Sequence, residues 1–193
     1  MAQLNIEETK TNLKAKKFLM WLFLVSSFIY FAGLTSGFIV YTAGSANRGI
    51  KTILPEEFMY STAAIILSSL TMHLAVRAGK GLRFGSQQLF LALTFVLGIV
   101  FFVIQWKAWN VLASRGIMFS FNKNASQSFV YVFVWSHLAH ILAGLGLIVG
   151  AMLGRVRNIA QIRNVFRLEI TSIFWHFIDI LWIYLYVFLL LNQ

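Results

Sequence analysis

The sequence predicts an all-α integral membrane protein built as a bundle of five transmembrane helices. Of its 193 residues, 59% are hydrophobic and only 11% are charged, and the mean hydropathy is +0.76. A membrane-spanning helix needs roughly 20 apolar residues, and five apolar runs of about this length or longer occur along the chain. We therefore expect one membrane domain over residues 1–193 and no large soluble domain.

The five spans follow the apolar runs in order, separated by segments that hold most of the charge. Residues 1–16 form a polar tail, and the apolar run after it is too long, and lacks the cleavage pattern, for a signal peptide. The second span is expected to begin after Pro55, because proline followed by Glu56 and Glu57 is typical of a helix N-terminus. The predicted spans are residues 17–43, 57–77, 87–112, 126–153 and 169–191.

The distribution of Lys and Arg predicts the orientation. Eleven of the sixteen lie in the N-terminal tail and around the loops after the second and fourth spans, and five lie on the other side. The positive-inside rule places the N-terminus in the cytoplasm and the C-terminus outside. Such juxtamembrane charges also explain the net charge of +10 without a nucleic-acid partner. Arg155 and Arg157 are candidates for phospholipid headgroups, with positive-inside topology as an equally good explanation.

Two further compositional features bear on packing and on cofactors. The absence of cysteine excludes a disulfide framework, a c-type haem attachment and any thiolate-ligated metal centre. Small residues at four-residue spacing predict close helix packing, within the chain or against a partner. They are Gly33 and Gly37 in the first span, and Ala139, Ala143, Gly146, Gly150 and Gly154 in the fourth.

Ionisable residues inside the apolar runs are the candidate functional residues. Each costs roughly 2.5–3.5 kcal/mol when it faces lipid, so we expect them to face the bundle interior. Glu169, His176 and Asp179 fall within an arc of about 80° on a helix of 100° per residue, and so form one polar stripe. His137 and His140, three residues apart in the fourth span, are possible counterparts.

Three interpretations of these five residues compete. In the first, which we favour, the last two spans pack with histidine and carboxylate groups facing each other, as an interhelical polar cluster. In the second they bind a metal or haem, although the Glu-x-x-His repeats of di-iron bundles do not occur. In the third they relay protons, although the outer half of the last span offers only two tyrosine hydroxyls. The chain contains no recognisable catalytic pair or phosphate loop.

Three segments resemble subunit III of the haem-copper terminal oxidases. The run W-H-F-I-D-I-L-W, residues 175–182, resembles the family signature W-H-F-x-D-x-x-W, and Glu169 stands seven residues before His176, where the family also has a glutamate. H-L-A-H-I-L-A-G, residues 137–144, resembles H-G-L-H-x-x-x-G, and K-F-L-M-W-L-F-L-V-S-S, residues 17–27, resembles a lysine-led M-W-L-F-L-x-S-E segment. The likeness extends from about residue 13 to 191 and corresponds to the last five spans of longer members.

Three departures from the family pattern bear on mechanism. Ser27 stands where the family often has a glutamate, and Ala108 stands where a second acid follows Gln105. The loss of both carboxylates makes a charge-carrying function less expected than a structural one. The lipid-filled cleft of longer members also needs two helices that a five-span chain lacks, and a partner is a candidate for that space.

The resemblance implies a non-catalytic subunit of a cytochrome c oxidase-type complex in a bacterial inner membrane, in direct contact with subunit I. It would bind no haem or copper of its own, since these belong to partner subunits, but would hold structural phospholipid. Its implied work is to stabilise the catalytic subunit, retain lipid and guide oxygen. The alternatives are the homologous subunit of a quinol oxidase or nitric oxide reductase, and an independent small proton channel or transporter.

Overall fold

The computed structural model describes residues 2–44, 54–116, 125–156 and 160–192, without the side chains of residues 2–10, 155 and 156. These residues form five helices and contain no strand. The helices are α1 (Ala2–Ala43), α2 (Glu57–Lys80), α3 (Phe84–Ser114), α4 (Ala125–Val156) and α5 (Gln161–Leu191). Each is long and apolar enough to cross a membrane. The predicted all-α bundle of five membrane-spanning helices is confirmed.

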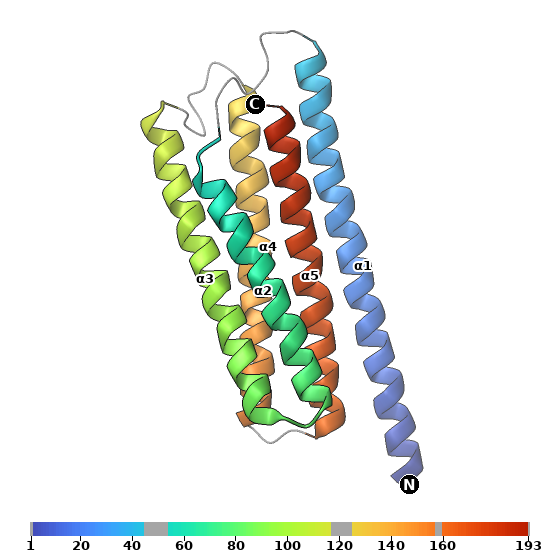
Figure 1. The fold of residues 1–193 in the computed structure, drawn as a ribbon. Coiled ribbons are helices and arrows are strands. Elements are labelled where there is room, and N and C mark those ends of the chain that lie inside the picture. Colours follow the sequence, from blue (N-terminus) through green and yellow to red (C-terminus); the bar gives the residue numbers. More distant parts are fainter. Residues whose placement is uncertain (1, 45–53, 117–124, 157–159, 193) are drawn as a thin grey trace.

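Helices α2 to α5 pack side by side, and α1 lies along the outer side of α4 and α5 (Figure 1). The beginning of α1, the turn between α2 and α3, the end of α4 and the beginning of α5 all lie at one end of the bundle, at the bottom of Figure 1. We call it the N-terminal end. The C-terminus lies at the opposite end.

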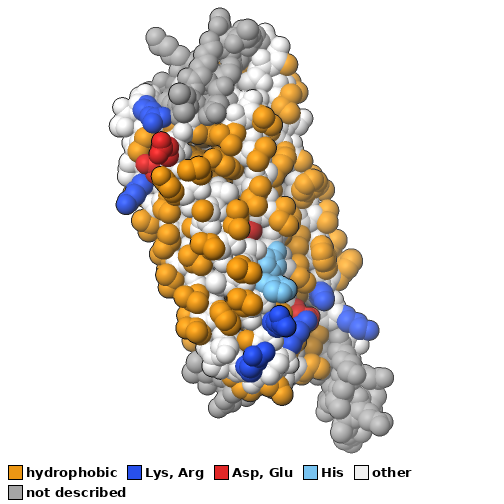
Figure 2. Space-filling model, in the orientation of Figure 1, with side chains coloured by type: hydrophobic (Ala, Val, Ile, Leu, Met, Phe, Trp, Pro, Cys, Tyr) orange, Lys and Arg blue, Asp and Glu red, His pale blue; other side chains and the backbone are white. Residues whose placement is uncertain are grey.

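The outer surface is apolar along the length of the bundle (Figure 2). Exposed large hydrophobic side chains occur on all five helices, including Phe18 and Trp21 of α1 and Leu67 of α2. Lys and Arg side chains gather toward the two ends of the visible face. An apolar belt between charged ends is what a lipid bilayer requires, and the protein is an integral membrane protein.

Aromatic side chains from all five helices fill the core. Phe101 of α3 meets the ring of Trp182 of α5 edge-on at 5.0 Å, and Phe58 of α2 stacks on the same indole at 5.8 Å. The second buried indole of α5, Trp175, is 0% exposed and lies against Gly98 of α3 and Gly144 of α4. A Cβ on either glycine would come within 2.9 Å of the Trp175 ring. These two glycines therefore make room for the largest side chain of the core.

The four-residue stripes of small residues do not make such contacts. A Cβ added at Gly33, Gly146 or Gly150 would meet nothing within 4 Å, and Ala139 and Ala143 are exposed. Within this chain, close approach depends instead on Gly79, Gly98 and Gly144, which the four-residue spacing did not single out. Most members of the stripes are exposed or half-buried, whereas Gly154 is buried. Gly146 and Gly150 line a hollow between α4 and α5 rather than a tight helix contact.

Polar contacts attach α1 to the rest of the bundle at successive depths. Ser27 Oγ lies 3.2 Å from His140 Nε2 of α4, and Tyr30 Oη lies 2.9 Å from Ser136 Oγ of the same helix. Nearer the other end, Thr35 Oγ1 lies 2.9 Å from the hydroxyl of Tyr184 of α5. These bonds attach α1 together with its buried side chains Leu24, Phe31 and Phe38.

Several helices extend beyond their apolar runs at the N-terminal end. Helix α1 begins at Ala2, so residues 2–16 of the polar tail form its first turns, and α5 begins at Gln161 rather than 169. Gln87 and Asn164 exchange two amide hydrogen bonds of 3.2 Å, and Gln161 Nε2 donates to the Gly79 carbonyl at 3.0 Å. Because polar side chains find partners on neighbouring helices, the helices continue where hydropathy falls.

Candidate functional site

The residues of the W-H-F-x-D-x-x-W signature face a row of hydroxyl groups on α2. Trp175 Nε1 donates to Ser68 Oγ at 3.0 Å, and Trp182 Nε1 donates to Thr62 Oγ1 at 2.9 Å. His176 Nδ1 lies 2.6 Å from Ser69 Oγ, and the imidazole tautomer decides which atom donates. We call this set the α2–α5 seam: Thr62, Ser68 and Ser69 of α2 with Trp175, His176, Asp179 and Trp182 of α5.

Helical spacing explains why these residues meet. On α5, residues 175, 179 and 182 fall within about 60° at 100° per residue, and residue 176 lies beside them. On α2, residues 62 and 69 are seven apart, close to two turns, and Ser68 belongs to its buried face with Ile65 and Met72. Two stripes of matching period therefore lie along each other. In lipid, such hydroxyl and indole groups need partners inside the protein.

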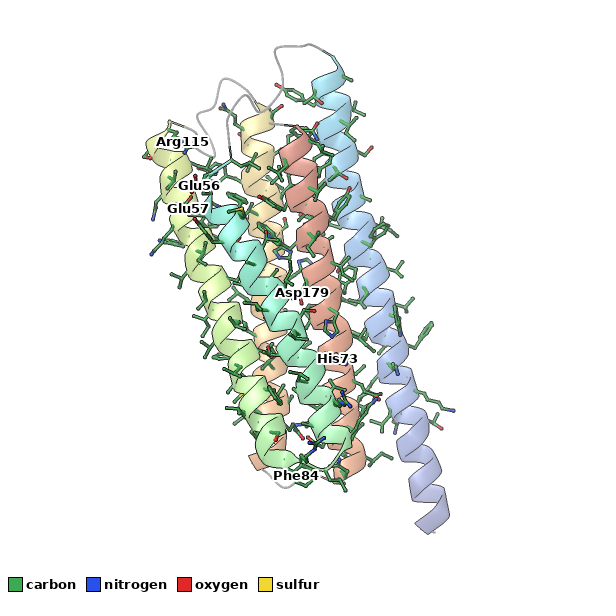
Figure 3. All side chains as sticks on the ribbon, viewed as in Figure 1. Glu56, Glu57, His73, Phe84, Arg115 and Asp179 are labelled. Atoms are coloured by element: carbon green, nitrogen blue, oxygen red, sulfur yellow. The ribbon has the colours of Figure 1, made fainter. Side chains whose placement is uncertain are left out.

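Asp179 is the unusual member of the seam. It lies near the middle of the bundle's length (Figure 3) and is 3% exposed. Neither carboxylate oxygen has a hydrogen-bond partner of good geometry among the described residues. A carboxyl group in such a dry position is costly, because burial removes water from it without full replacement.

The two histidines of α4 face different neighbours. His137 is 0% exposed, and its ring lies 5.0 Å from Trp182 and 5.8 Å from Phe101, while neither of its nitrogens has a hydrogen-bond partner in the described residues. His140 lies between α4 and α1: Nδ1 contacts the Ser136 carbonyl at 2.7 Å and Nε2 contacts Ser27. Ser27, which stands where the family often has a glutamate, is thus a partner of His140.

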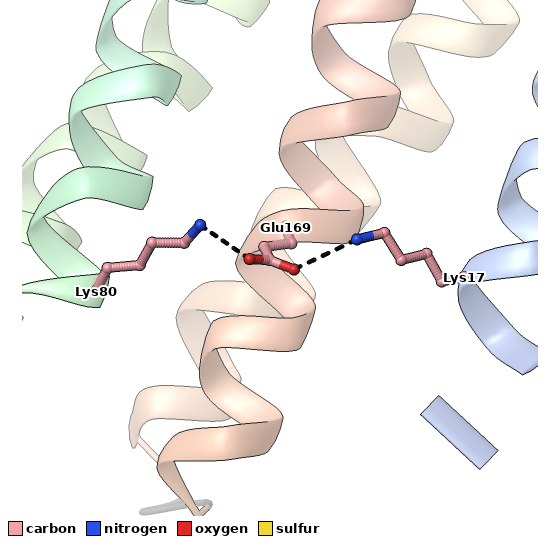
Figure 4. A network of polar contacts seen from close by, with 3 residues as sticks. All are labelled: Lys17, Lys80 and Glu169. Carbon is pink, nitrogen blue, oxygen red and sulfur yellow. Dashed lines mark ion pairs between the residues drawn. The ribbon is translucent and has the colours of Figure 1, made fainter. Parts of the chain in front are cut away.

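Glu169 connects three helices at the N-terminal end (Figure 4). One carboxylate oxygen lies 2.9 Å from Lys80 Nζ of α2, and the other lies 3.7 Å from Lys17 Nζ of α1. The three side chains are 31–54% exposed, so water screens both ion pairs. The carboxylate acts as a bridge between α1, α2 and α5 near the membrane surface.

The five predicted site residues therefore do not form one hydrogen-bonded network in the described part of the chain. The polar stripe of α5 faces α2 and its serine and lysine side chains, and His140 faces α1. Only His137 and Asp179 remain without hydrogen-bond partners, on α4 and α5. Arg155 and Arg157 were the candidates for phospholipid headgroups. Arg155 belongs to α4, but its side chain is not among those described, and Arg157 lies outside the described residues.

Sequence reasoning missed the α2 side of the seam. Its signal was the run of hydroxyl residues in Y-S-T-A-A-I-I-L-S-S-L-T, residues 60–71, within an apolar span. A second missed group joins α2 and α3: Gln105 Nε2 donates to Ser61 Oγ at 2.8 Å, and Thr71 and Thr94 share a hydrogen bond of 2.8 Å. Searching spans for hydroxyl groups as well as charges would have found both.

The described residues contain no group of three or more His, Cys, Asp or Glu side chains placed to hold one metal ion. What the arrangement does chemically is to pair indole, imidazole and amide groups with hydroxyl oxygens between helices. It sets α5 against α2 and α1 against α4 in fixed register.

Five membrane-spanning helices locked by polar seams define a helical integral membrane protein. Residues 2–192 match the family model of cytochrome c oxidase subunit III. The chain belongs to this family, which confirms the resemblance carried by the signature of α5.

Bacterial relatives cover nearly the whole chain. It is 33% identical over 193 residues to cytochrome bo(3) ubiquinol oxidase subunit 3 of Buchnera aphidicola subsp. Acyrthosiphon pisum, covering 97% of this chain and 89% of the relative. Its counterpart in the subspecies Schizaphis graminum is 31% identical, covering 97% and 98%. Cytochrome c oxidase subunit 3 of Bacillus subtilis is 29% identical over 181 residues, covering 92% and 87%. Relatives thus occur in both kinds of oxidase.

Proposed function

We propose that the chain is the non-catalytic subunit III of an aerobic respiratory terminal oxidase. It associates with the other oxidase subunits, contacts subunit I directly and lies in a bacterial inner membrane. Family membership over residues 2–192 is the observation that carries the proposal, and the bacterial relatives support the location. The excess of Lys and Arg at the N-terminal end supports an orientation with this end in the cytoplasm.

The chain supports the catalytic subunit and carries out no chemistry of its own. It stabilises the catalytic subunit, retains phospholipid and guides oxygen, while haem and copper belong to partner subunits. The α2–α5 seam supports the mechanical part, since its hydrogen bonds hold the helices in register across the bilayer. Glu169, His176, Asp179, His137 and His140 serve this helix packing, with a proton relay as the rival role for the buried Asp179.

Purification tests the assignment. The chain, tagged and extracted from its native membranes in mild detergent, should carry with it a haem- and copper-containing large subunit with a visible haem spectrum. Recovery of a colourless homo-oligomer from membranes that contain active oxidase would contradict the proposal and favour an independent channel or transporter. Stoichiometric metal in this polypeptide after separation from its partners would favour a metalloprotein.

Asp179→Asn separates the structural role from a proton role. The amide keeps the shape of the side chain and removes its charge and its acid. We expect the purified complex to lose subunit III more readily, or to inactivate sooner during turnover, while its initial oxidation rate changes little. Immediate loss of proton pumping in a fully assembled complex would contradict the structural role.

The electron donor of the complex has two candidates, a quinol and cytochrome c. The relatives include ubiquinol oxidase subunits at 33% and 31% identity and a cytochrome c oxidase subunit at 29%. The same purified complex distinguishes the donors. Oxygen consumption with a ubiquinol analogue and none with reduced cytochrome c would assign it to the quinol oxidases, and the reverse pattern to the cytochrome c oxidases.

A further inference from the structure

A strip of polar side chains lies on the outer surface of the bundle, beside the α2–α5 seam. On α2 it consists of Ser69, His73, Arg77 and Lys80, which fall within an arc of about 80° at 100° per residue. The last three are exposed and Ser69 is half-buried. His176 of α5 borders them, since its ring contacts Ser69 and interacts electrostatically with His73. We call these five residues the histidine strip.

His73 is the member of the strip that a lipid surface does not explain. It lies seven residues before Lys80, about 10 Å along α2, and Figure 3 shows it between Asp179 and the N-terminal end. Histidine side chains are visible on the surface between the middle of the bundle and the Lys and Arg group of that end (Figure 2). Arg77 and Lys80 have long side chains that reach the membrane surface, whereas an imidazole is too short to do so. No hydrogen bond joins the His73 side chain to another described residue. An ionisable group at this depth normally faces protein or water rather than lipid.

The outer face of α3 shows what a lipid-facing helix of this chain looks like. Between residues 89 and 104, every exposed or half-buried side chain of α3 is hydrophobic. Helices α2 and α3 are antiparallel neighbours joined by a short turn, so Ser69 and His73 lie at a depth within that range. Two adjacent helices therefore have different outer surfaces at the same depth. The surface of α3 suits lipid, and that of α2 suits protein.

We propose that the histidine strip is the docking site for a transmembrane helix of a partner oxidase subunit that carries a carboxylate at the depth of His73. Charge complementarity selects the carboxylate, because the exposed groups of the strip are an imidazole, a guanidinium and an ammonium, all of which donate hydrogen bonds. The acidic residues of α5 are engaged or covered, since Glu169 is bonded to Lys80 and Asp179 is 3% exposed. A lipid headgroup lies at the membrane surface, about 10 Å from the depth of His73. A partner helix is the occupant that brings an acceptor to this depth.

The docking site deepens the proposed function, because it rests on association with an oxidase and assigns that association to one face of the chain. In the assembled complex the polar groups of the strip would lie in the interior of a larger bundle, as polar groups within a membrane require. The outer face of α3 would remain in contact with lipid. The two faces therefore provide a test position and a matched control within one chain.

Photo-crosslinking in native membranes tests the position of the partner. The photoreactive residue p-benzoylphenylalanine replaces Leu70, three residues before His73, in the tagged full chain expressed with the other oxidase subunits. Irradiation should join the chain to one partner subunit, which mass spectrometry identifies. The same probe at Val96 of α3 is the control, because Leu70 and Val96 are similarly exposed, at 58% and 54%, and it should yield lipid adducts instead. Lipid adducts alone at Leu70, in a complex that retains its haem-bearing subunit, would overturn the docking site and leave the proposed function standing. A chain without that subunit would contradict both.

Substitutions of His73 test the carboxylate. His73→Leu removes the hydrogen-bond donor and should weaken retention of the chain by the purified complex about tenfold in a detergent dilution series, because the partner carboxylate loses its donor. His73→Lys keeps a cationic donor and should preserve most of the association. Ser36→Leu replaces an exposed polar residue of α1 in the same way and should have no effect. Equal retention of the wild type and His73→Leu would overturn the docking site, and a loss in His73→Lys as large as in His73→Leu would overturn the carboxylate.

Discussion

Gly144→Ala tests how tightly α5 is packed against its neighbours. The benzene half of the Trp175 indole lies against Gly144, and an added Cβ would lie 2.9 Å from its Cε3 and 3.0 Å from its Cζ3. On the other side, a Cβ at Gly98 would lie 2.9 Å from Trp175 Cη2. The indole has little freedom to move, because it is fully buried and its nitrogen is bonded to Ser68. The substitution therefore forces the ring against α3.

The magnitude follows from two opposing contributions. Inserting a methyl group into a packed core costs about 1–3 kcal/mol. Replacing glycine by alanine within a helix contributes about 0.5–1 kcal/mol of stability in the opposite direction. We expect a net loss of about 1–2 kcal/mol for Gly144→Ala. Gly33→Ala is the matched control, because its Cβ meets nothing within 4 Å and only the stabilising contribution remains.

The measurement is the free energy of unfolding of the full chain in mixed micelles titrated with a denaturing detergent, followed by circular dichroism. Gly144→Ala should unfold at a lower fraction of denaturing detergent than the wild type, and Gly33→Ala at the same fraction or a higher one. In a Trp175→Phe background the effect of Gly144→Ala should shrink, because phenylalanine lacks part of the ring that the methyl group meets. The reasoning is refuted if the two alanine variants have the same stability.

Two further predictions concern the polar contacts. Glu169→Gln should lower the free energy of unfolding by only about 0.5–1 kcal/mol, because both of its ion pairs are partly exposed. The difference from the wild type should vanish when unfolding is measured at high salt. A loss of stability that is independent of salt would contradict this prediction. Ser69→Ala removes the partner of His176 Nδ1 and should lower the free energy of unfolding by about 1–2 kcal/mol in the same assay. Ser36→Ala, at an exposed position of α1, is the control and should lower it little. Equal losses of stability in the two variants would contradict a specific bond between Ser69 and His176.

The fold followed from hydropathy because each span is a long apolar run, but the helix boundaries did not. Hydropathy falls at Gln87, Gln161 and Asn164. A sequence window cannot see that Gln87 and Asn164 are bonded to each other across helices, or that Gln161 donates to the Gly79 carbonyl of α2. The polar tail is likewise helical in the structure. Helix boundaries that depend on hydrogen bonds between helices cannot be predicted from the hydropathy of one segment.

The candidate site was foreseen on one helix and not on its partners. Periodicity placed Glu169, His176 and Asp179 on one stripe of α5. The contacts of Glu169 with Lys80 and of His176 with Ser69 do face α2. Periodicity carries no information about which helix lies opposite, so α4 was expected where α2 is found. His137 and His140 are separated by about 60° around α4, which is enough to turn one toward α3 and α5 and the other toward α1.

The position of α1 has a consequence for biogenesis. Its neighbours in the bundle are α4 and α5, the two helices that leave the ribosome last. While α2 and α3 are being inserted, the hydroxyl groups of Ser27 and Thr35 have neither His140 nor Tyr184 to meet. Helix α1 therefore gains its neighbours only after two later helices have been made, and a chain interrupted after α3 would leave its inner face uncovered.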